Sequence, residues 1–472
     1  MAYNRNTKLI PIMFRAAEHK FDGIAMASLM RKLAPLVLFA ALLVGLLMLS
    51  PVASYPVVQQ YDFTVPPEYQ GEYSALQGIL GSFNSSLGSL TPSENSFGYA
   101  TELLPANGNR GPALLQPNNL NSVAANLNAL QAMGIQGVTI AIGYPLLDPS
   151  FPNSAQYLSY FEQVVSMVHA RGMKVLIESQ ILFANTPYSP LTFNWASLPY
   201  SQYVTNHIAQ DQLIINKIRP DYLELGVEAD TEAYLSGYTQ LDTPTGWTSY
   251  VEQLLSSLNK GNTKLVAGAA TWLGTSYFTG FANDTKLDMI STHVYPIYGQ
   301  NLQTLLAIGK IAQHDNKRLA IDEAWEEKVL QPTGRAGGIG GPSITQQNVF
   351  SFWSPTDSEF LTLMAKFGKT FPVEYFSPFN EWYFFAYLNW TPTLDAEGYF
   401  QLSQQLYPVA AQNMNAGSLT PTGQTYSNLA RSTTALPEFS TFPFTTAALI
   451  IATLVAVSLV TRTRERFDSM IG

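Results

Sequence analysis

Short runs of apolar and β-branched residues alternate with longer segments of helical periodicity between residues 96 and 414. Each run has the length and composition of a buried strand in a parallel sheet. The eight strands predicted in this way are residues 96–101, 137–143, 173–182, 221–228, 264–270, 287–295, 318–323 and 373–378. Their alternation with helical segments is typical of consecutive βαβ units.

The segments between these strands have the pattern of amphipathic helices that end at a glycine. Residues 119–134 and 156–172 are two examples, with Gly134 and Gly172 as their C-terminal stops. The apolar face of the first helix consists of Leu120, Val123, Leu127 and Leu130. Helix, glycine and strand therefore form the repeated unit of this region.

Eight such units predict an α/β fold, the closed (β/α)8 or TIM barrel, over residues 96–414. An open doubly wound sheet fits less well because no glycine-rich nucleotide-binding turn follows the first strand. A segment rich in glycine and proline at 329–356 follows the seventh strand, and its length predicts a lid loop. It is not a phosphate-binding loop, because no strand directly precedes its glycines and no Gly-Lys-Ser/Thr follows them.

An uncharged apolar segment, residues 34–50, precedes the barrel region. It follows Arg31 and Lys32 and is followed by small residues, which is the order found in secretory signal peptides. The long region before it leaves two alternatives for residues 1–54, a cleaved signal peptide or a retained signal anchor.

A second apolar segment, residues 442–460, is long enough to cross a bilayer as a helix and contains no charge. A buried core helix is the alternative, which the lack of an amphipathic face disfavours. Three arginines follow at once, so the bias of basic residues toward the cytoplasm predicts a cytoplasmic tail at 461–472.

These segments predict a protein of the cell membrane, single-pass or anchored at both ends, with the barrel on the extracytoplasmic side. The membrane is thus an expected partner, through the C-terminal helix. Residues 55–95 are rich in Ser, Gly, Pro and Tyr with weak periodicity, which predicts a stalk or an N-terminal decoration. Residues 415–441 are predicted to be a Ser/Thr-rich linker.

The composition excludes several kinds of chemistry. Hydrophobic residues make up 46% of the 472 residues and charged residues only 12%, in keeping with membrane segments. Cysteine is absent, which excludes disulfides, zinc–thiolate sites and cysteine nucleophiles. The net charge of −9 and the lack of a basic run argue against a nucleic-acid partner. None of the five histidines lies in a metal-binding motif, so we expect neither a metal nor another cofactor.

Two glutamates close predicted strands, Glu228 on the fourth and Glu323 on the seventh. Active sites of (β/α)8 barrels lie at the carboxyl ends of the strands. Alternation along the seventh strand groups Glu323 with Leu319 and Ile321, a face that we expect to point into the barrel. A pair of carboxylates is what cleavage of a glycosidic bond requires, one as the acid and the other as the nucleophile.

Other residues at the strand ends are candidates for holding a sugar. On the sixth strand, Tyr295 could hydrogen-bond the nucleophile and His293 could help to orient the pair. The remaining candidates for substrate contact are Glu178, Trp272, Trp325, Asn380, Glu381 and Trp382. Aromatic rings stack on sugar faces, although core packing is the commoner role of any one of them. A single rim glutamate is likewise more often solvated or salt-bridged than catalytic, so the prediction depends on the pair.

Three motifs resemble the corresponding strands of clan A glycoside hydrolases, namely DYLELGVEAD at 221–230, STHVYPIYG at 291–299 and IDEAWEE at 321–327. The resemblance implies a retaining enzyme with Glu228 as the acid/base and Glu323 as the nucleophile.

Two further resemblances concern the end of the chain. The eighth strand, VEYFSPFNEW, resembles that of arabinogalactan endo-β-1,4-galactanases, which implies Trp382 as a sugar-stacking platform. Pro-Glu-Phe at 437–439, the apolar segment and the basic tail resemble the C-terminal anchors of archaeal surface proteins.

One position departs from the clan pattern, because Val227 stands where an asparagine usually precedes the acid/base. That amide contacts the substrate 2-hydroxyl, so its loss implies a slower enzyme, another donor, or no activity. The sequence therefore predicts a retaining hydrolase of β-linked polysaccharides or glycoprotein glycans, with carbohydrate as its substrate. A catalytically inactive barrel that serves as a carbohydrate-binding or envelope protein is the main alternative, and a transglycosylase with the same carboxylates is another.

Overall fold

A computed structural model describes residues 60–93, 95–295, 300–326, 328 and 347–433 of the chain. The chain divides into two compact units, residues 1–57 and residues 58–472. All described residues belong to the second unit.

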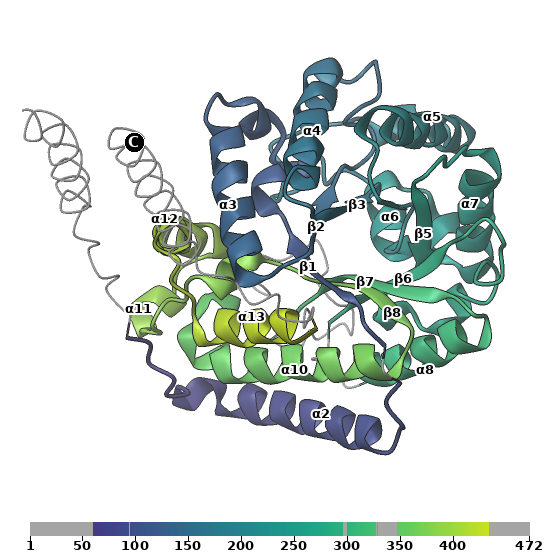
Figure 1. Cartoon of the computed structure of the whole chain (residues 1–472). Helices are drawn as coiled ribbons and strands as arrows, with labels where there is room; N and C mark the ends of the chain where they lie inside the picture. Colours follow the sequence, from purple (N-terminus) through teal and green to yellow (C-terminus); the bar gives the residue numbers. More distant parts are fainter. Residues whose placement is uncertain (1–59, 94, 296–299, 327, 329–346, 434–472) are drawn as a thin grey trace, which may run out of the picture. The chain divides into compact units, whose positions relative to one another are not determined.

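Eight parallel strands of this unit form a closed barrel in which each strand pairs with its neighbours in sequence and β8 pairs with β1 (Figure 1). The strands are β1 (Gly98–Glu102), β2 (Gly137–Ala141), β3 (Lys174–Glu178), β4 (Tyr222–Glu224), β5 (Lys264–Gly268), β6 (Met289–Val294), β7 (Arg318–Ala324) and β8 (Val373–Pro378). The predicted (β/α)8 barrel and all eight strands are confirmed, although β3 and β4 end earlier than expected.

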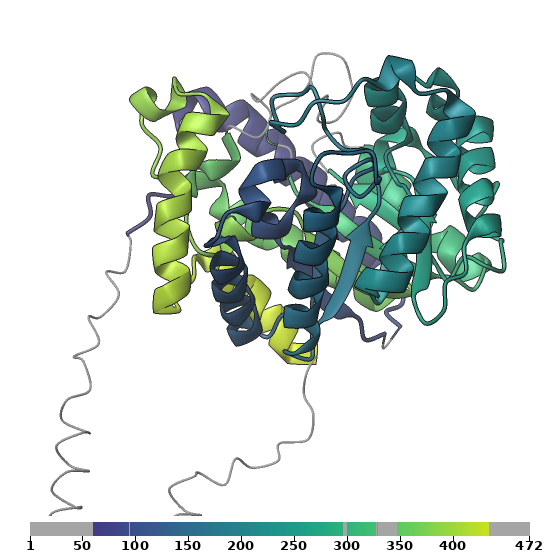
Figure 2. The same ribbon diagram turned by 90° about the horizontal axis from the view of Figure 1, so that it is seen from above.

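Helices surround the strands, as the view from above shows (Figure 2). They are α3 (Asn119–Met133), α4 (Ser154–His169), α5 (Tyr200–Leu213), α6 (Ala229–Ser236), α7 (Pro244–Ser257), α8 (Gln300–His314), α10 (Ser354–Thr370), α11 (Pro392–Asp395), α12 (Tyr399–Ala416) and α13 (Pro421–Thr433). The predicted stop of α3 is confirmed, because Gly134 has a φ of 88° and its N–H caps the carbonyls of Leu130 and Gln131.

The barrel interior changes from apolar to polar toward the carboxyl ends of the strands. Its apolar layer consists of Ala100, Leu176, Tyr222, Val266, Met289, Ala320 and Tyr375. Two residues further along six of these strands are Glu102, Glu178, Glu224, Ser291, Asp322 and Ser377, all of them buried. Because side chains alternate along a strand, these polar groups lie on the same inner face as the apolar layer.

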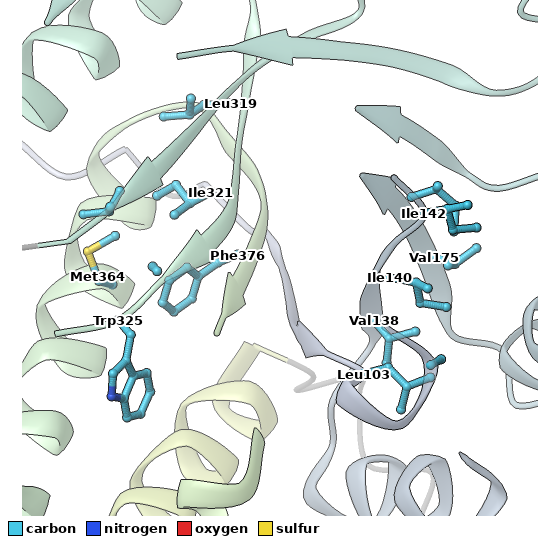
Figure 3. Close-up of a cluster of buried hydrophobic side chains, with 14 of the residues drawn as sticks. Leu103, Val138, Ile140, Ile142, Val175, Leu319, Ile321, Trp325, Met364 and Phe376 are labelled. Atoms are coloured by element: carbon cyan, nitrogen blue, oxygen red, sulfur yellow. The ribbon is translucent and has the colours of Figure 1, made fainter. Parts of the chain in front are cut away.

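The expected orientation of the seventh strand is wrong. Leu319 and Ile321 pack in the core between the sheet and the helices, together with Met364 of α10 (Figure 3), whereas Ala320 faces the interior. The register of β7 shifts by one residue against both neighbours between Ala320 and Ala324. This bulge, which simple alternation does not predict, lets Glu323 reach the mouth of the barrel.

The N-terminal region before the barrel contains a helix, α2 (Gln70–Gly88), that packs along α10 (Figure 1). Its buried face consists of Leu76, Leu80, Phe83 and Leu87. Residues 70–88 are therefore a helical addition to the barrel and not an extended stalk. The weak periodicity of this region reflects the glycines and serines that fill the exposed face of α2.

The predicted linker at 415–441 is wrong for residues 415–433, because α13 packs against α10 and belongs to the barrel, and residues 434–441 lie outside the described residues. Tyr426 of this helix is fully buried, and its hydroxyl donates a hydrogen bond of 2.6 Å to the Ala100 carbonyl. Small and hydroxyl-bearing residues dominate its buried face, which explains why the segment resembles a linker in sequence.

Within the described residues, no helix is both long and apolar enough to cross a bilayer. The predicted signal or anchor segment at 1–54, the membrane helix at 442–460 and the tail at 461–472 lie outside the described residues. Most of the predicted lid loop at 329–356 also lies outside the described residues. Of its described part, residues 347–353 form short 3-10 turns, and α10 begins at Ser354.

Candidate active site

A cavity of about 680 Å³ opens at the carboxyl ends of the strands. Both predicted catalytic glutamates line it. Among the other residues that line it are Glu102, Asn107, Asn109, Arg110, Glu178, Gln180, Trp272, Tyr295, Trp325, Glu326, Asn348, Asn380, Trp382, Gln404 and Tyr407. The cavity thus combines carboxylates, amides and aromatic rings.

Glu228 and Glu323 meet at this mouth from different strands. Glu323 is placed by the bulge in β7, whereas Glu228 follows the turn after β4 and is the N-cap residue of α6. One carboxylate oxygen from each glutamate lies within 4.8 Å of the other and of His293. The side chains of Glu228 and Glu323 are 13% and 16% exposed, so both remain accessible from the cavity.

His293 of β6 lies directly between the two glutamates. Its Nδ1 is 2.9 Å from Glu228 Oε1 and 3.0 Å from Glu323 Oε2, and the imidazole is fully buried. Burial lowers the pKa of His293, but the carboxylates of Glu323 and Glu228 outweigh it and raise the pKa well above its usual value. His293 thus contacts both glutamates, and its orienting role stays a prediction.

Tyr295 donates its hydroxyl hydrogen to Glu323 Oε1, as the sequence predicts. Burial alone would raise the pKa of Glu323, but His293 and the Tyr295 hydroxyl hold it below its usual value. Glu323 is therefore ionised near neutral pH, which is the state that a carboxylate nucleophile needs.

The three tryptophans expected to contact a sugar all line the cavity. Trp272 and Trp382 are partly exposed there, and Trp272 Nε1 donates a hydrogen bond of 3.1 Å to Asp230. Trp325 is only 1% exposed and stacks on Tyr383 with ring centroids 5.5 Å apart. Packing thus accounts for most of the Trp325 surface, and the first two offer their rings to a ligand.

The remaining predicted contacts divide into two groups. Glu178 and Asn380 line the cavity. Glu381 is fully buried behind the wall, where its Oε2 accepts a hydrogen bond of 3.3 Å from the Leu104 amide. Burial raises the pKa of Glu381 well above its usual value. Glu381 therefore does not belong to the lining of the cavity.

Glu102 is a cavity residue that the sequence reasoning missed. Burial and the charge of Glu323 raise its pKa to about 8, although Asn107 donates a hydrogen bond of 2.5 Å to its Oε1. The signal was present, because Glu102 directly follows the first predicted strand, as Glu228 and Glu323 close theirs. It was lost because the predicted strand ended at residue 101.

Val227 is fully buried and offers no amide to the cavity. Amide side chains reach the cavity from other segments, at Asn107, Asn109, Gln180, Asn348, Asn380 and Gln404. Val227 therefore supplies no amide to a ligand, whereas other amides are present in the same cavity.

Two groups of described residues have the spacing of metal ligands. The first is Glu228, His293 and Glu323, and the second is Glu178, His293 and Asp322. His293 belongs to both, with Nδ1 facing the first group and Nε2 lying 3.9 Å from an oxygen of Glu178 and of Asp322.

No protein-family model and no curated protein sequence matches the chain. Several solved structures resemble it. One is a GH5_18 protein variant from Bifidobacterium longum in complex with Manβ1-4GlcNAc, with 12% identity over 71% of this chain and 78% of that one, and a TM-score of 0.47.

Two other similar structures come from different bacteria. The exo-β-1,4-mannosidase of an Opitutaceae bacterium is 11% identical over 73% of this chain and 61% of that one, with a TM-score of 0.48. The endo-β-1,4-glucanase of Xanthomonas axonopodis is 12% identical over 72% of this chain and 99% of that one, with a TM-score of 0.38. The barrel is established by its own strand pairing and not by these resemblances. The expected likeness to galactanases stays a prediction.

Proposed function

We propose that the chain is a retaining glycoside hydrolase that acts on β-linked glycans. The observation that carries this proposal is the pair of Glu228 and Glu323 at the mouth of the barrel, with oxygens within 4.8 Å of each other. In retaining enzymes the two carboxyl groups are about 5 Å apart, whereas inverting enzymes need a wider gap to admit a water molecule.

In the first step, the Glu323 carboxylate attacks the anomeric carbon of the sugar. The bond from that carbon to the glycosidic oxygen breaks, and Glu228 gives its proton to the leaving oxygen. The Tyr295 hydroxyl and His293 Nδ1 both contact Glu323, so they fix the direction of its attacking oxygen. The product of this step is a glycosyl ester on Glu323.

In the second step, water attacks the anomeric carbon of the ester. Glu228 now accepts the proton of that water, and the Glu323 carboxylate leaves with the electron pair of the ester bond. One sugar with retained configuration is released, and both glutamates return to their starting protonation states.

The aromatic rings of the cavity support a carbohydrate substrate. Trp272, which follows β5, and Trp382, which follows β8, offer partly exposed rings to the cavity, and the amides of the lining can bind sugar hydroxyls. We propose β-linked polysaccharides or glycoprotein glycans as the substrate class.

A catalytically inactive barrel that binds carbohydrate is the second candidate function. The buried Val227 favours it, since the amide that strengthens binding in the transition state is missing at this position. A transglycosylase would use the same two glutamates and pass the sugar to an acceptor other than water.

We further propose that this chemistry takes place outside the cell, with the chain held in the membrane by residues 442–460. The sequence of the two flanking apolar segments is the support for this location. Protease treatment of intact cells tests it, because a barrel on the outer side is digested and a cytoplasmic barrel is protected.

The direct test is hydrolysis of a panel of β-linked glycans by the full chain and by the variants Glu228→Gln and Glu323→Gln. Each variant should lose at least about 1,000-fold in kcat, because each removes one partner of the double displacement. NMR should show that the first product has the same anomeric configuration as the bond cleaved in the substrate.

Glu374→Gln is the matched control, because Glu374 pairs with Lys264 at the opposite end of the barrel. It should keep full activity. If the folded wild type binds glycans without cleaving them, the chain is a carbohydrate-binding protein and not a hydrolase. Elongated products would indicate a transglycosylase. Inversion of the anomer would contradict the proposed mechanism.

A further inference from the structure

Below the floor of the cavity, three side chains from different strands converge inside the barrel. Glu178 Oε1 of β3 and Asp322 Oδ1 of β7 each lie 3.9 Å from His293 Nε2 of β6. Glu178, Asp322 and His293 are 6%, 1% and 0% exposed. This inner cluster is separate from the pair formed by Glu228 and Glu323, which His293 contacts through its other nitrogen.

Several polar atoms of the inner cluster have no hydrogen-bond partner among the described residues. Among the described residues, His293 Nε2 and both carboxylate oxygens of Asp322 have no hydrogen-bond partner. Glu224 pairs with Glu178 in the register of β3 and β4, and its Oε2 also has none within the described part of the chain. Buried polar groups in this state are costly unless a ligand satisfies them.

The contacts of His293 Nδ1 determine what Nε2 presents to the cluster. Nδ1 faces carboxylate oxygens of Glu228 and Glu323 at 2.9 Å and 3.0 Å, and those oxygens accept hydrogen bonds. Nδ1 therefore carries the hydrogen in the neutral imidazole, and the lone pair of Nε2 points at Glu178 and Asp322. Three acceptors then face one another, which is the arrangement that binds a cation.

An imidazolium at His293 would leave the carboxyl oxygens of this interior without a partner. Glu178, Glu224 and Asp322 are all buried there. An Nε2–H would also be 3.9 Å from either oxygen, which is beyond hydrogen-bond distance. A divalent cation would satisfy the unpartnered atoms of these side chains together.

We propose that Glu178, Asp322 and His293 Nε2 hold one divalent metal ion beneath the cavity floor. Their ligand atoms all lie within 4.8 Å of one another. One imidazole nitrogen with carboxylate oxygens suits Zn²⁺ or Mn²⁺ better than Ca²⁺ or Mg²⁺, which prefer oxygen alone. Glu224 supplies a further oxygen, and the ion enters past Glu178, which lines the cavity.

The ion would also act on the glutamate pair through His293. A metal on Nε2 fixes the tautomer with hydrogen on Nδ1, and this hydrogen points at Glu228 and Glu323. The inner site is thus a positioning device for the imidazole, and it takes no part in bond cleavage. It replaces the expectation from the sequence that the chain binds no metal.

The test uses the full chain, stripped of metal by a chelator and then titrated with Co²⁺, Zn²⁺ or Mn²⁺. The wild type should retain one ion per chain after gel filtration, measured by mass spectrometry of the elements. Its Co²⁺ form should show visible absorption bands of mixed nitrogen and oxygen coordination. Asp322→Asn and Glu178→Gln should each weaken retention by at least about tenfold.

Glu381→Gln is the matched control, because Glu381 is an equally buried carboxylate outside the inner cluster. Both Glu381→Gln and Glu323→Gln should retain the ion. If the wild type retains none of the three metals, the proposal is overturned and the carboxyls are neutralised by protons. Retention by Asp322→Asn equal to that of the wild type also overturns the proposal. If that variant does not fold, equal retention by Glu178→Gln overturns it instead. The readout needs no substrate, so it is independent of the proposed hydrolysis.

Discussion

The ionisation of Glu323 depends on two neighbours, one in β6 and one directly after it. His293 Nδ1 lies 3.0 Å from one of its oxygens, and the Tyr295 hydroxyl donates to the other. Both contacts stabilise the carboxylate against burial, which alone would raise its pKa. The proposed nucleophile of β7 is therefore influenced by two residues that lie two positions apart, His293 in β6 and Tyr295 directly after it.

Replacement of Tyr295 by Phe should lower kcat by about 100-fold, because the donor to the nucleophile is lost. The pKa of Glu323 should rise, since one of the groups that lowers it is removed. Activity requires ionised Glu323, so the acid limb of the kcat profile should move to higher pH. The profile of kcat against pH, measured for wild type and variant, checks both effects.

Tyr99→Phe serves as the control for this change. Tyr99 is also a buried tyrosine on a strand, and its hydroxyl has no hydrogen-bond partner within the described residues. The control should leave the acid limb in place. An unchanged limb in Tyr295→Phe would show that its hydroxyl does not set the ionisation of Glu323.

The secondary-structure elements show where the sequence pattern is informative. Hydrophobic periodicity identifies all eight strands because a parallel sheet buried on both faces leaves a run of apolar residues. It misses the bulge in β7, since an extra residue in one strand depends on its neighbours and leaves no mark on that strand alone. It also misses α13, whose buried face is made of hydroxyl and small residues. Glu228 and Glu323 were singled out because each ends a predicted strand. Asp322 was not, because only the bulge lets it and Glu323 both face inward.

Through Glu232, one turn after Glu228, helix α6 is tied to α5, to α7 and to the segment that follows β3. Its carboxylate accepts hydrogen bonds from the hydroxyls of Tyr203 and Tyr250 and from the Ile181 amide. Burial raises the pKa of Glu232 to about 7, although these hydrogen bonds lower it. The backbone N–H of Glu232 donates to the Glu228 carbonyl at 2.9 Å, so the same residue holds the start of α6.

Stability should therefore decrease as the pH rises from about 4.5 to about 7. In this window folded Glu232 keeps a proton that the unfolded chain has released, so the free energy of unfolding falls with pH, by up to about 3 kcal/mol. Glu232→Gln should reduce this fall. Urea denaturation at pH 5 and pH 8 measures it.

Glu252→Gln is the control for the removal of a carboxylate, because Glu252 is exposed on α7. The control should keep the pH dependence of the wild type. The interpretation fails if Glu232→Gln loses as much stability between pH 5 and pH 8 as the wild type does. Some pH dependence of stability should remain in Glu232→Gln, because other carboxyl groups, such as that of Glu102, also have a raised pKa.

The turn between β4 and α6 depends on Gly226. Its φ is 149°, and a β-carbon at this position would lie 2.6 Å from the buried ring of Trp247. Gly226→Ala should lower the free energy of unfolding by about 1–3 kcal/mol and reduce kcat, because Glu228 is two residues away. Thermal unfolding and kcat on one glycan measure the two effects.

The variant Gly237→Ala measures the effect of backbone strain without a steric clash like the one expected in Gly226→Ala. Gly237 ends α6 with a φ of 80°, and nothing lies within 4 Å of a β-carbon there. This variant should lose about 1 kcal/mol of stability from strain alone and keep its kcat. If Gly226→Ala behaves in the same way, the turn does not position Glu228.

The charge of the whole molecule should select against anionic glycans. The formal net charge is −9, and among the described residues that line the cavity Arg110 is the one cation. Five glutamates line it, namely Glu102, Glu178, Glu228, Glu323 and Glu326. Burial raises the pKa of Glu102, Glu178 and Glu326, whereas the pKa of Glu323 is held below its usual value. An anionic polymer would therefore meet a negative protein and then the Glu323 carboxylate, and both effects oppose binding.

A neutral β-glucan and its carboxymethylated derivative test this with one backbone and one linkage. At low ionic strength, KM for the anionic polymer should be at least about tenfold higher, and the gap should narrow in 1 M salt, where the screening length is about 3 Å. A gap that salt does not change would indicate steric exclusion of the carboxymethyl groups. Equal KM values at low salt would show that Arg110 and the amides of the lining outweigh the carboxylates, so the cavity would accept uronate-containing glycans as well.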